Sequence, residues 1–275
     1  STPAEEALPT HPLSPVRLTT IGFIAVAAAC FAAADIEIST LDPWTEMGRL
    51  ALGIVTPDFT STDRLAEALM HTVAFALLGV AFGNVLGFAL ALVFDYAIVR
   101  TGCAVIRAVH ELFWALLFLQ IFGLTAWTGI LAIGIPYAGI IAKVYAEILE
   151  EADPAAYKLL PPGTGRFSAF LFTRAPDSFA HFKTYSLYRL ECGLRSSAVL
   201  GFVGLPTLGF HLESAFAQGN YSEASALLLI FYVVIATIRR WVHRSLLPFY
   251  LIAAVLVLPE GMPVSWNAAW AFITH

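Results

Sequence analysis

The chain has 275 residues, of which 59% are hydrophobic and only 13% are charged. A soluble domain carries about 25% charged residues, so this chain has more apolar side chains than one soluble core can bury. Its formal net charge of −5 is small and excludes the basic surface that nucleic-acid binding requires. The composition therefore predicts an integral membrane protein.

Residues 1–16 are polar, acidic and rich in proline. They lack the basic start and the small-residue cleavage site of a signal peptide, and we expect a disordered tail. The first candidate spanning helix runs from Leu18 to Ala34. After it, the segment from Met47 to Val55 is short, which favours a helix lying at the membrane interface.

Five further segments are apolar enough to serve as spanning helices, which need about 20 residues each. They cover residues 66–94, 104–122, 129–148, 185–203 and 224–238. In the first of these, Gly79, Gly83 and Gly87 recur at every fourth position, a pattern that lets helix backbones approach closely. Lys143 and Glu147 are also four residues apart, and we expect them to pair on one helix face.

The end of the chain contains one more apolar segment, from Leu246 to Leu258, which is short for a spanning helix. Trp266 and Trp270 beyond it suit a membrane interface. We therefore divide the chain into a tail at residues 1–16, a transmembrane domain at 17–244 and an added membrane-associated segment at 245–275. The added segment either spans as a seventh helix or lies on the surface.

Lysine and arginine side chains gather in alternate loops. The basic loops are expected on the cytoplasmic side, which places the N-terminus and the polar segment 150–183 there. Their basic residues are Arg100, Arg107, Lys158, Arg166, Arg174, Lys183, Arg239, Arg240 and Arg244, whereas the opposite loops carry only Arg49 and Arg64.

None of the common hydrolase or nucleotide-binding motifs is present: there is no GxxxxGK[ST], no HExxH and no GxSxG. The seven histidines and three cysteines have no metal-ligand spacing. We expect no catalytic residue, no metal site and no cofactor in this chain. If ATP drives its activity, the ATPase is another protein.

The segment from Tyr185 to Gly209 combines charges with a helix-breaking end. Glu191 and Arg195 lie four residues apart, and we expect this intramembrane ion pair to form within the chain or with a partner chain. Beyond them come Gly201, Gly204, Pro206 and Gly209. Broken backbone at membrane depth is tolerated only where it is buried in protein or lines a cavity.

This segment resembles the fifth-helix signature of the phosphonate-uptake ABC permeases. The resemblance rests on Tyr185, Tyr188, Arg189, Glu191, Arg195, Ser196, Val199-Leu200-Gly201 and Val203-Gly204, and upstream on residues 114–118 and on Lys143, Tyr145, Ala146 and Glu147. It covers roughly residues 60–242.

The resemblance implies an all-α permease bundle of the type I importer class, with about six transmembrane helices, in a bacterial inner membrane. It implies a second permease subunit, identical or homologous, two ATP-binding cassette subunits that bind ATP and Mg, and an extracytoplasmic solute-binding protein. The cargo would be a phosphonate, phosphite or hypophosphite-like anion. The translocation path and gate would contain Arg195, Ser196, Ser197, Gly201, Gly204, Leu205, Pro206, Thr207, Gly209 and His211.

In this family a cytoplasmic loop couples the permease to the ATPase, and the segment 150–183 corresponds to it. Gly163 and Pro176 have the family's spacing, but the acidic residue of the family's EAA motif is absent. We expect Thr164 to cap a short helix after the two prolines at 161–162. The coupling residues would be Ala155, Ala156, Tyr157, Lys158, Gly163, Thr164, Arg166 and Pro176, with Glu147, Glu150, Glu151 and Asp153 as a secondary acidic cluster.

Three other interpretations stay open. An ion-coupled secondary carrier would use Glu191 and Arg195 as a charge relay. An ABC permease for another small solute would share the fold but not the cargo, and a membrane scaffold would not transport at all.

Leu205 and Pro206, where relatives have smaller residues, predict a narrow gate that favours a small oxyanion.

Overall fold

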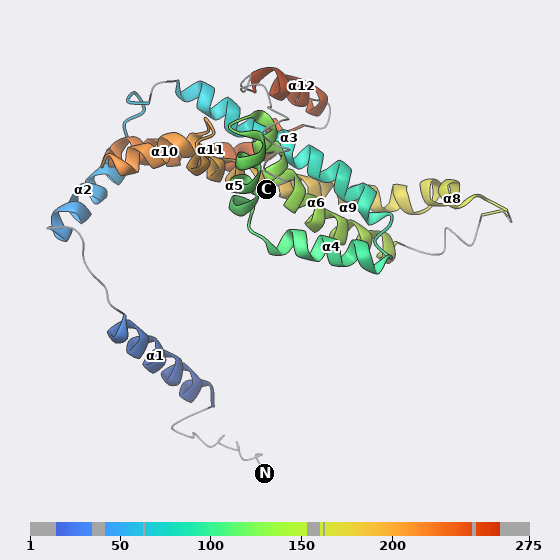
Figure 1. Cartoon of the computed structure of the whole chain (residues 1–275), viewed down its shortest axis with the longest axis horizontal. Coiled ribbons are helices and arrows are strands. Elements are labelled where there is room, and N and C mark those ends of the chain that lie inside the picture. Colours follow the sequence, from blue (N-terminus) through green and yellow to red (C-terminus); the bar gives the residue numbers. More distant parts are fainter. Residues whose placement is uncertain are drawn as a thin grey trace, which may run out of the picture. The chain divides into compact units, whose positions relative to one another are not determined.

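The computed structural model describes residues 15–34, 42–62, 64–152, 160–161, 163–243 and 246–258. Within these ranges every regular element is helical, as predicted (Figure 1). Internal contacts divide the chain into two units, residues 1–48 and 49–275. Among the described residues, four helices are long and apolar enough to cross a membrane, and six spans result if each of two bent helix pairs counts as one.

The first unit contains α1 (Pro15–Ala33), a 19-residue helix with no buried residue. Because its apolar side chains surround the whole helix, they need lipid or another chain to cover them. The interfacial helix predicted at residues 47–55 begins earlier, as α2 (Pro43–Val55). Asp42 accepts a hydrogen bond from the backbone N–H of Thr45 at 3.2 Å, and this N-cap explains the earlier start.

The second unit is a bundle whose centre is a tight pair of long helices, α3 and α6. Its helices are α3 (Leu65–Ala91), α4 (Ala97–Ala108), α5 (Glu111–Phe122), α6 (Ala126–Glu151), α8 (Arg166–Phe172), α9 (Arg174–Val199), η1 (Leu200–Val203), α10 (Leu208–Ala217), α11 (Tyr221–Trp241) and α12 (Leu247–Val257).

The predicted glycine stripe forms the contact between α3 and α6. Gly79, Gly83 and Gly87 all place bare backbone against α6, and a Cβ added at Gly87 would lie only 2.8 Å from the Cβ of Ile141. A larger residue would force the two backbones apart. The close packing expected from the sequence is therefore confirmed, and it builds the core around fully buried residues such as Phe75.

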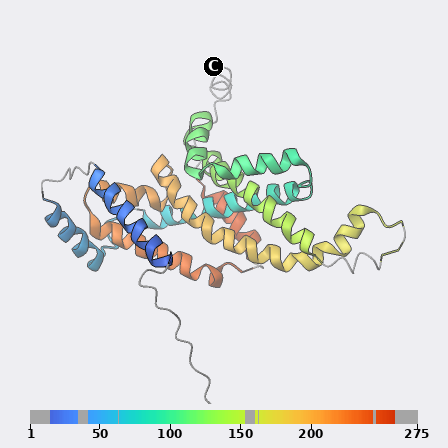
Figure 2. The ribbon, with the colours of Figure 1, turned by 90° about the horizontal axis from the view of Figure 1, so that it is seen from below.

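The third predicted span, at residues 104–122, is wrong as a single helix. The segment forms two helices, α4 and α5, that meet at 93° (Figure 2). The backbone of Val109 and His110 is extended, and the His110 ring accepts a hydrogen bond from the N–H of Leu112 at 3.2 Å. Because this side chain caps a new helix, the chain turns here, which hydropathy alone does not reveal.

The polar segment 150–183 is more helical than predicted. α8 ends at Phe172, and α9 starts at Arg174 instead of near Tyr185. α9 then runs as one long helix into η1, and α10 leaves at a bend of 53° (Figure 2). The bend lies among the glycine and proline residues where the sequence predicted a break.

The last described helix, α12, packs along α3. Its 11 residues reach about 16 Å at ~1.5 Å per residue, or about half of a hydrocarbon core of ~30 Å. The described part of the added C-terminal segment is therefore too short to span by itself.

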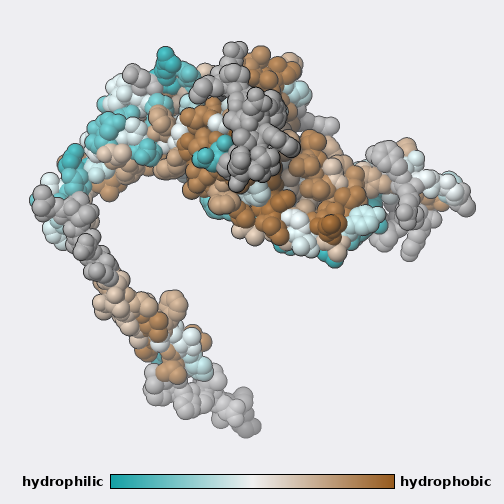
Figure 3. Space-filling model, viewed as in Figure 1, coloured by the Kyte–Doolittle hydropathy of each residue, from teal (hydrophilic) through white to brown (hydrophobic). Residues whose placement is uncertain are grey.

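Large apolar side chains remain exposed on both units, and hydrophobic colour covers α1 and much of the second unit (Figure 3). Phe23 is 77% exposed, Ile98 83% and Leu256 79%. Patches of this extent on a soluble monomer would drive aggregation. Together with the apolar helices, they identify a multi-pass membrane protein.

Candidate functional site

The most distinctive charged group in the bundle is Arg189, half-buried on α9. Its Nε and Nη2 donate hydrogen bonds to the hydroxyl oxygen of Tyr185 at 2.8 and 2.6 Å. Its Cζ lies 5.1 to 5.6 Å from the ring centroids of Tyr137, Tyr185 and Tyr188. These four residues form what we call the Arg189 cluster. Aromatic faces attract a cation without neutralising it.

The cluster contains no carboxylate, and within the described residues no carboxylate forms a salt bridge with Arg189. The guanidinium is therefore held in place by neutral groups while its charge stays available. A planar, oriented guanidinium is the side chain best suited to bind phosphorus oxyanions with two hydrogen bonds. The sequence comparison included Arg189 among the resembling residues but did not single it out as a site.

Two serines predicted for the translocation path lie further along α9. Ser196 is buried and shares a 3.0 Å hydrogen bond with the hydroxyl of Tyr137, which links it to the Arg189 cluster. Ser197 is also buried, and its hydroxyl donates to the backbone oxygen of Leu194 at 2.7 Å. Ser196 thus adjoins the cluster, whereas Ser197 is used inside its own helix.

Among the described residues of this one chain, Glu191 and Arg195 do not form the predicted ion pair with each other; the pairing with a partner chain stays a prediction. Glu191 accepts a hydrogen bond from Nε of Arg239 at 2.9 Å, across from α9 to α11. Arg195 is exposed, and its Nη2 approaches the sulfur of Cys192 at 3.5 Å. The reason is tertiary: the last turn of α11 brings a closer cation to Glu191 than the one on its own helix.

The predicted gate forms a closed turn between η1 and α10. Gly204 adopts φ +93°, a conformation that favours glycine. A Cβ at Gly209 would overlap the carbonyl oxygen of Ala198, and one at Gly201 would overlap the backbone of Gly209, so the two sides of the turn are in backbone contact. Glycine is required at both positions.

The backbone N–H donors of this turn are largely satisfied. The N–H groups of Gly204 and Leu205 bond to Gly201 and Leu200, and that of Leu208 bonds to the Thr72 hydroxyl at 2.8 Å. Helix ends bind anions through free N–H groups, and these are occupied. The remaining predicted residues divide into buried Leu205 and Thr207 and half-buried Pro206 and His211.

Leu205 was predicted to narrow the gate, but its side chain is buried within this chain. A buried side chain does not line a translocation path. The side chains that are exposed beside the turn are those of Phe202 and Phe210, at 61% and 42%. The Phe210 ring packs edge-on against His211, with centroids 5.7 Å apart. The apolar surface at this end of α9 is therefore aromatic.

A cavity of about 510 Å³ lies between α3, α9 and α12. Its walls are mainly apolar, but Asn84, Tyr145 and Ser186 form a hydrogen-bonded triangle at its edge. The Tyr145 hydroxyl lies 2.6 Å from both Asn84 Oδ1 and Ser186 Oγ, and Ser186 donates to Asn84 at 2.9 Å. Since each group finds partners inside the triangle, it ties α3, α6 and α9 together.

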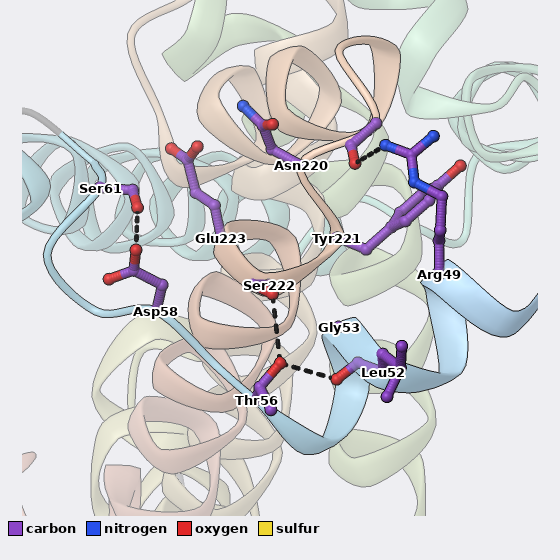
Figure 4. Close-up of a pocket in the computed structure, with 11 residues that line it drawn as sticks. Arg49, Leu52, Gly53, Thr56, Asp58, Ser61, Asn220, Tyr221, Ser222 and Glu223 are labelled. Carbon is purple, nitrogen blue, oxygen red and sulfur yellow. Dashed lines mark hydrogen bonds between the residues drawn. The ribbon is translucent and has the colours of Figure 1, made fainter. Parts of the chain in front are cut away.

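A second, polar pocket of about 410 Å³ lies where residues 49–61 meet the start of α11 (Figure 4). On one side of the pocket, the Cζ of Arg49 lies 5.9 Å from the centroid of the Tyr221 ring. On the other side are Asp58 and Glu223, whose carboxylates accept from hydroxyls of Ser61 and Thr62. The hydroxyls of Ser61 and Thr60 lower the pKa of Asp58 to about 2.

This pocket separates one cation from two carboxylates, and the Nη2 of Arg49 also donates to the backbone oxygen of Gly219 at 3.4 Å. The contact beneath it is close, because a Cβ at Gly53 would lie 2.5 Å from the Cβ of Tyr221. Arg49 was expected only in a connector that contains an interfacial helix, and the pocket was not predicted. Its residues come from two segments far apart in the chain, and no local pattern joins them.

The predicted coupling residues are described only in part. Residues 155–158 lie outside the described ranges, as does Asp153. Gly163 adopts φ +92°, and the Thr164 hydroxyl donates to the oxygen of Pro161 at 2.7 Å. Thr164 therefore does not cap α8, whose N-cap is Gly165.

The other coupling residues lie at helix ends. Arg166 begins α8, and Pro176 is exposed in the first turn of α9. The predicted pair of Lys143 and Glu147 is confirmed, at 3.3 Å. Glu150 and Glu151 end α6 and are both exposed. In the described part of the chain, no group of histidine, cysteine or acidic residues is arranged to hold a metal ion.

Comparison with known proteins agrees with the resemblance seen in the sequence. No protein-family model matches the chain. The phosphite transport system permease protein PtxC of Stutzerimonas stutzeri is 26% identical over 229 residues, which cover 79% of this chain and 83% of the relative. The phosphate-import permease protein PhnE of Mycolicibacterium smegmatis is 26% identical over 66% of this chain but only 36% of its own length.

A third relative, the putative phosphite transport system permease protein HtxE of S. stutzeri, is 29% identical over 52% of this chain and 55% of its own length. Among solved structures, a chain of an amino acid ABC transporter crystal structure matches with a TM-score of 0.54 and 17% identity. The match covers 78% of this chain and 99% of that one. The structural likeness shows the fold.

The all-helical fold of the described residues thus agrees with the structural comparison. The expected resemblance is confirmed: this is an all-helical, multi-pass membrane protein with the fold of an ABC transporter chain, similar in sequence to the permeases of phosphite and phosphonate transport.

Proposed function

We propose that this chain is the membrane-spanning permease subunit of an ATP-driven ABC importer for phosphite, phosphonate or hypophosphite-like anions. The Arg189 cluster carries the proposal. It offers an oriented cation, without a carboxylate partner among the described residues, on the helix that resembles the family's fifth helix. A permeating phosphorus oxyanion would exchange water for this guanidinium at one step of its passage.

In this proposal the N-terminus and the segment 150–183 face the cytoplasm of a bacterial inner membrane. Two ATP-binding cassette subunits, which hold ATP and Mg, dock against the coupling residues around Gly163. A second permease subunit, identical or homologous, completes the path, and the translocation subunit itself catalyses no reaction.

The turn at residues 204–207 then lies toward the outer side, where a two-fold arrangement brings both copies to the axis. Because Leu205 is buried, the constriction would be formed by exposed Phe202 and Phe210. The loops that carry Arg49 and Arg64 are expected on the outer side by their few basic residues, so in this proposal the polar pocket between Arg49 and Asp58 would receive a charged segment of the extracytoplasmic solute-binding protein.

The test is anion uptake by the complete complex, purified with its ATPase and binding protein and reconstituted in vesicles. Arg189→Gln should lower phosphite uptake about tenfold or more, since a hydrogen bond to a charged group contributes about 1.5–3 kcal/mol. Arg189→Lys should restore part of it, because it keeps the charge but loses the planar fork.

Arg240→Gln is the matched control, because Arg240 is exposed on α11 and, among the described residues, has no hydrogen bond, ion pair or ring contact with the cluster. Its uptake should equal that of the unmodified chain. Equal uptake in Arg189→Gln would contradict the role of the cluster. Uptake that stops with an uncoupler while ATP is constant would instead favour the ion-coupled carrier.

A further inference from the structure

His71 connects two segments that are distant in the sequence. It lies on α3 with only 5% of its surface exposed. Its Nδ1 is 3.0 Å from the backbone oxygen of Pro206, in the turn that follows η1. Its Nε2 is 3.1 Å from the backbone oxygen of Val257, the last residue of α12. One imidazole ring thus contacts both the turn and the C-terminal helix.

Both partners are carbonyl oxygens, which only accept hydrogen bonds. A neutral imidazole has one N–H group and one bare nitrogen, whereas the imidazolium has two N–H groups. The neutral ring therefore makes one of these two bonds and sets its other nitrogen against an oxygen lone pair. Only the protonated ring makes both bonds.

The second partner oxygen lies at the end of a helix. Val257 belongs to the last turn of α12, where carbonyls lack partners within the helix. The carboxyl end of a helix carries partial negative charge and attracts cations. A protonated His71 therefore acts as a C-terminal cap for α12 while it holds the turn.

The titratable groups on α3, α10 and α12 have other surroundings. On α3, Glu67 pairs with Arg64 at 3.7 Å. On α10, Glu213 is exposed and His211 packs against Phe210. The one titratable group of α12, Tyr250, donates to the backbone oxygen of Trp241 at 2.7 Å. In the described part of the chain, none of these groups has a hydrogen bond or ion pair with His71.

We propose that His71 is a proton-dependent clasp that fastens α12 to the turn at residues 204–207. Protonation adds the second hydrogen bond, so the clasp tightens as the pH falls through the range in which histidine takes up a proton. The clasp itself follows from the contacts above. Its consequence for transport, a turn that moves less freely at acidic pH, rests on the proposed function.

Hydrogen exchange of the segment 247–258 in the purified full-length chain tests the clasp. We compare the unmodified chain with His71→Phe at pH about 5.5 and about 8, which bracket the ordinary histidine value of about 6.5. At each pH, the exchange rate of His71→Phe is divided by that of the unmodified chain. This ratio removes the intrinsic pH dependence of hydrogen exchange. The segment should exchange at least threefold more slowly in the unmodified chain at pH 5.5, and this ratio should shrink at pH 8.

Two more variants sharpen the result. His181→Phe removes an exposed histidine of α9 and should match the unmodified chain at both pH values. His71→Gln keeps one donor at every pH, so its protection should no longer change with pH. If the ratio of exchange rates between His71→Phe and the unmodified chain is the same at both pH values, the proposal is wrong.

If His71→Phe fails to fold, ¹⁵N NMR of the histidine-labelled chain tests directly whether both ring nitrogens of His71 carry a proton. At pH about 5.5 the His71 ring should show two protonated nitrogens with slowly exchanging protons, assigned by their loss in His71→Gln. A bare nitrogen at that pH would overturn the proposal. Neither measurement requires transport, so failure of the clasp and failure of the permease function are distinguishable.

Discussion

Arg189 is a cation whose immediate neighbours are three aromatic rings and one hydroxyl. Each cation–π contact stabilises the charged side chain by about 0.5–2 kcal/mol. This is less than the free-energy cost of removing a full charge from water. The side chain is therefore most stable when water or an anion reaches its remaining donors. A residue with this balance is suited to a path that alternates between filled and empty states.

At the same scale, the glycine stripe gives a sharp prediction for stability. Gly87→Leu should destabilise the bundle by about 1–3 kcal/mol, because the added side chain overpacks the contact with α6. Gly102→Leu on α4 is the control, since a Cβ there meets no atom within 4 Å. Thermal unfolding in detergent measures both. Equal unfolding temperatures for the two variants would contradict the close packing.

Much of the candidate site could not be predicted residue by residue. Arg189 and Tyr185 are one helical turn apart and were visible as a local pattern, but Tyr137 comes from α6 and required the fold. The same holds for Arg239, which replaces Arg195 as the partner of Glu191. Local spacing finds neighbours on one helix, whereas the strongest partners here lie on another.

At the scale of elements, the contact of Glu191 with Arg239 joins α9 to α11. A double-mutant cycle with Glu191→Gln and Arg239→Gln should give a coupling energy of about 0.5–1 kcal/mol, the upper range for an exposed pair. The Arg239 side chain is 73% exposed, so salt should weaken the coupling.

The matched cycle pairs Glu191→Gln with Arg195→Gln and should give no coupling. Chemical unfolding of the detergent-solubilised chain measures both cycles. A larger coupling with Arg195 than with Arg239 would restore the pairing expected from helical spacing.

The elements themselves were largely predictable. Apolar length located α1, α3, α6 and α11, and glycine spacing predicted that α3 packs closely on another helix, which the structure identifies as α6. The bend at His110 and the early start of α9 were not predicted. In both cases the decisive feature is polar: a histidine cap in the first, and in the second a charged stretch that forms helix without being apolar.

For the whole molecule, the distribution of basic residues predicts a definite orientation. In intact cells whose chain lacks the three native cysteines, Ser61→Cys should react with a membrane-impermeant thiol reagent. Arg174→Cys should react only after the cells are opened. Both positions are exposed, so accessibility within the fold does not limit either reaction. The reverse labelling pattern would invert the orientation and place the Figure 4 pocket in the cytoplasm.

The unbroken length of α9 makes it a lever. Its 26 residues continue into the four residues of η1, a rod of about 45 Å at ~1.5 Å per residue. The corner at Thr173 joins one end of this rod to α8, and the other end carries Phe202. A tilt of about 10° around the corner would sweep the far end through about 8 Å on that length, more than the width of a small oxyanion. If the proposed function is right, a modest push on the short helix would thereby become a displacement wider than a small oxyanion at the far end of the rod.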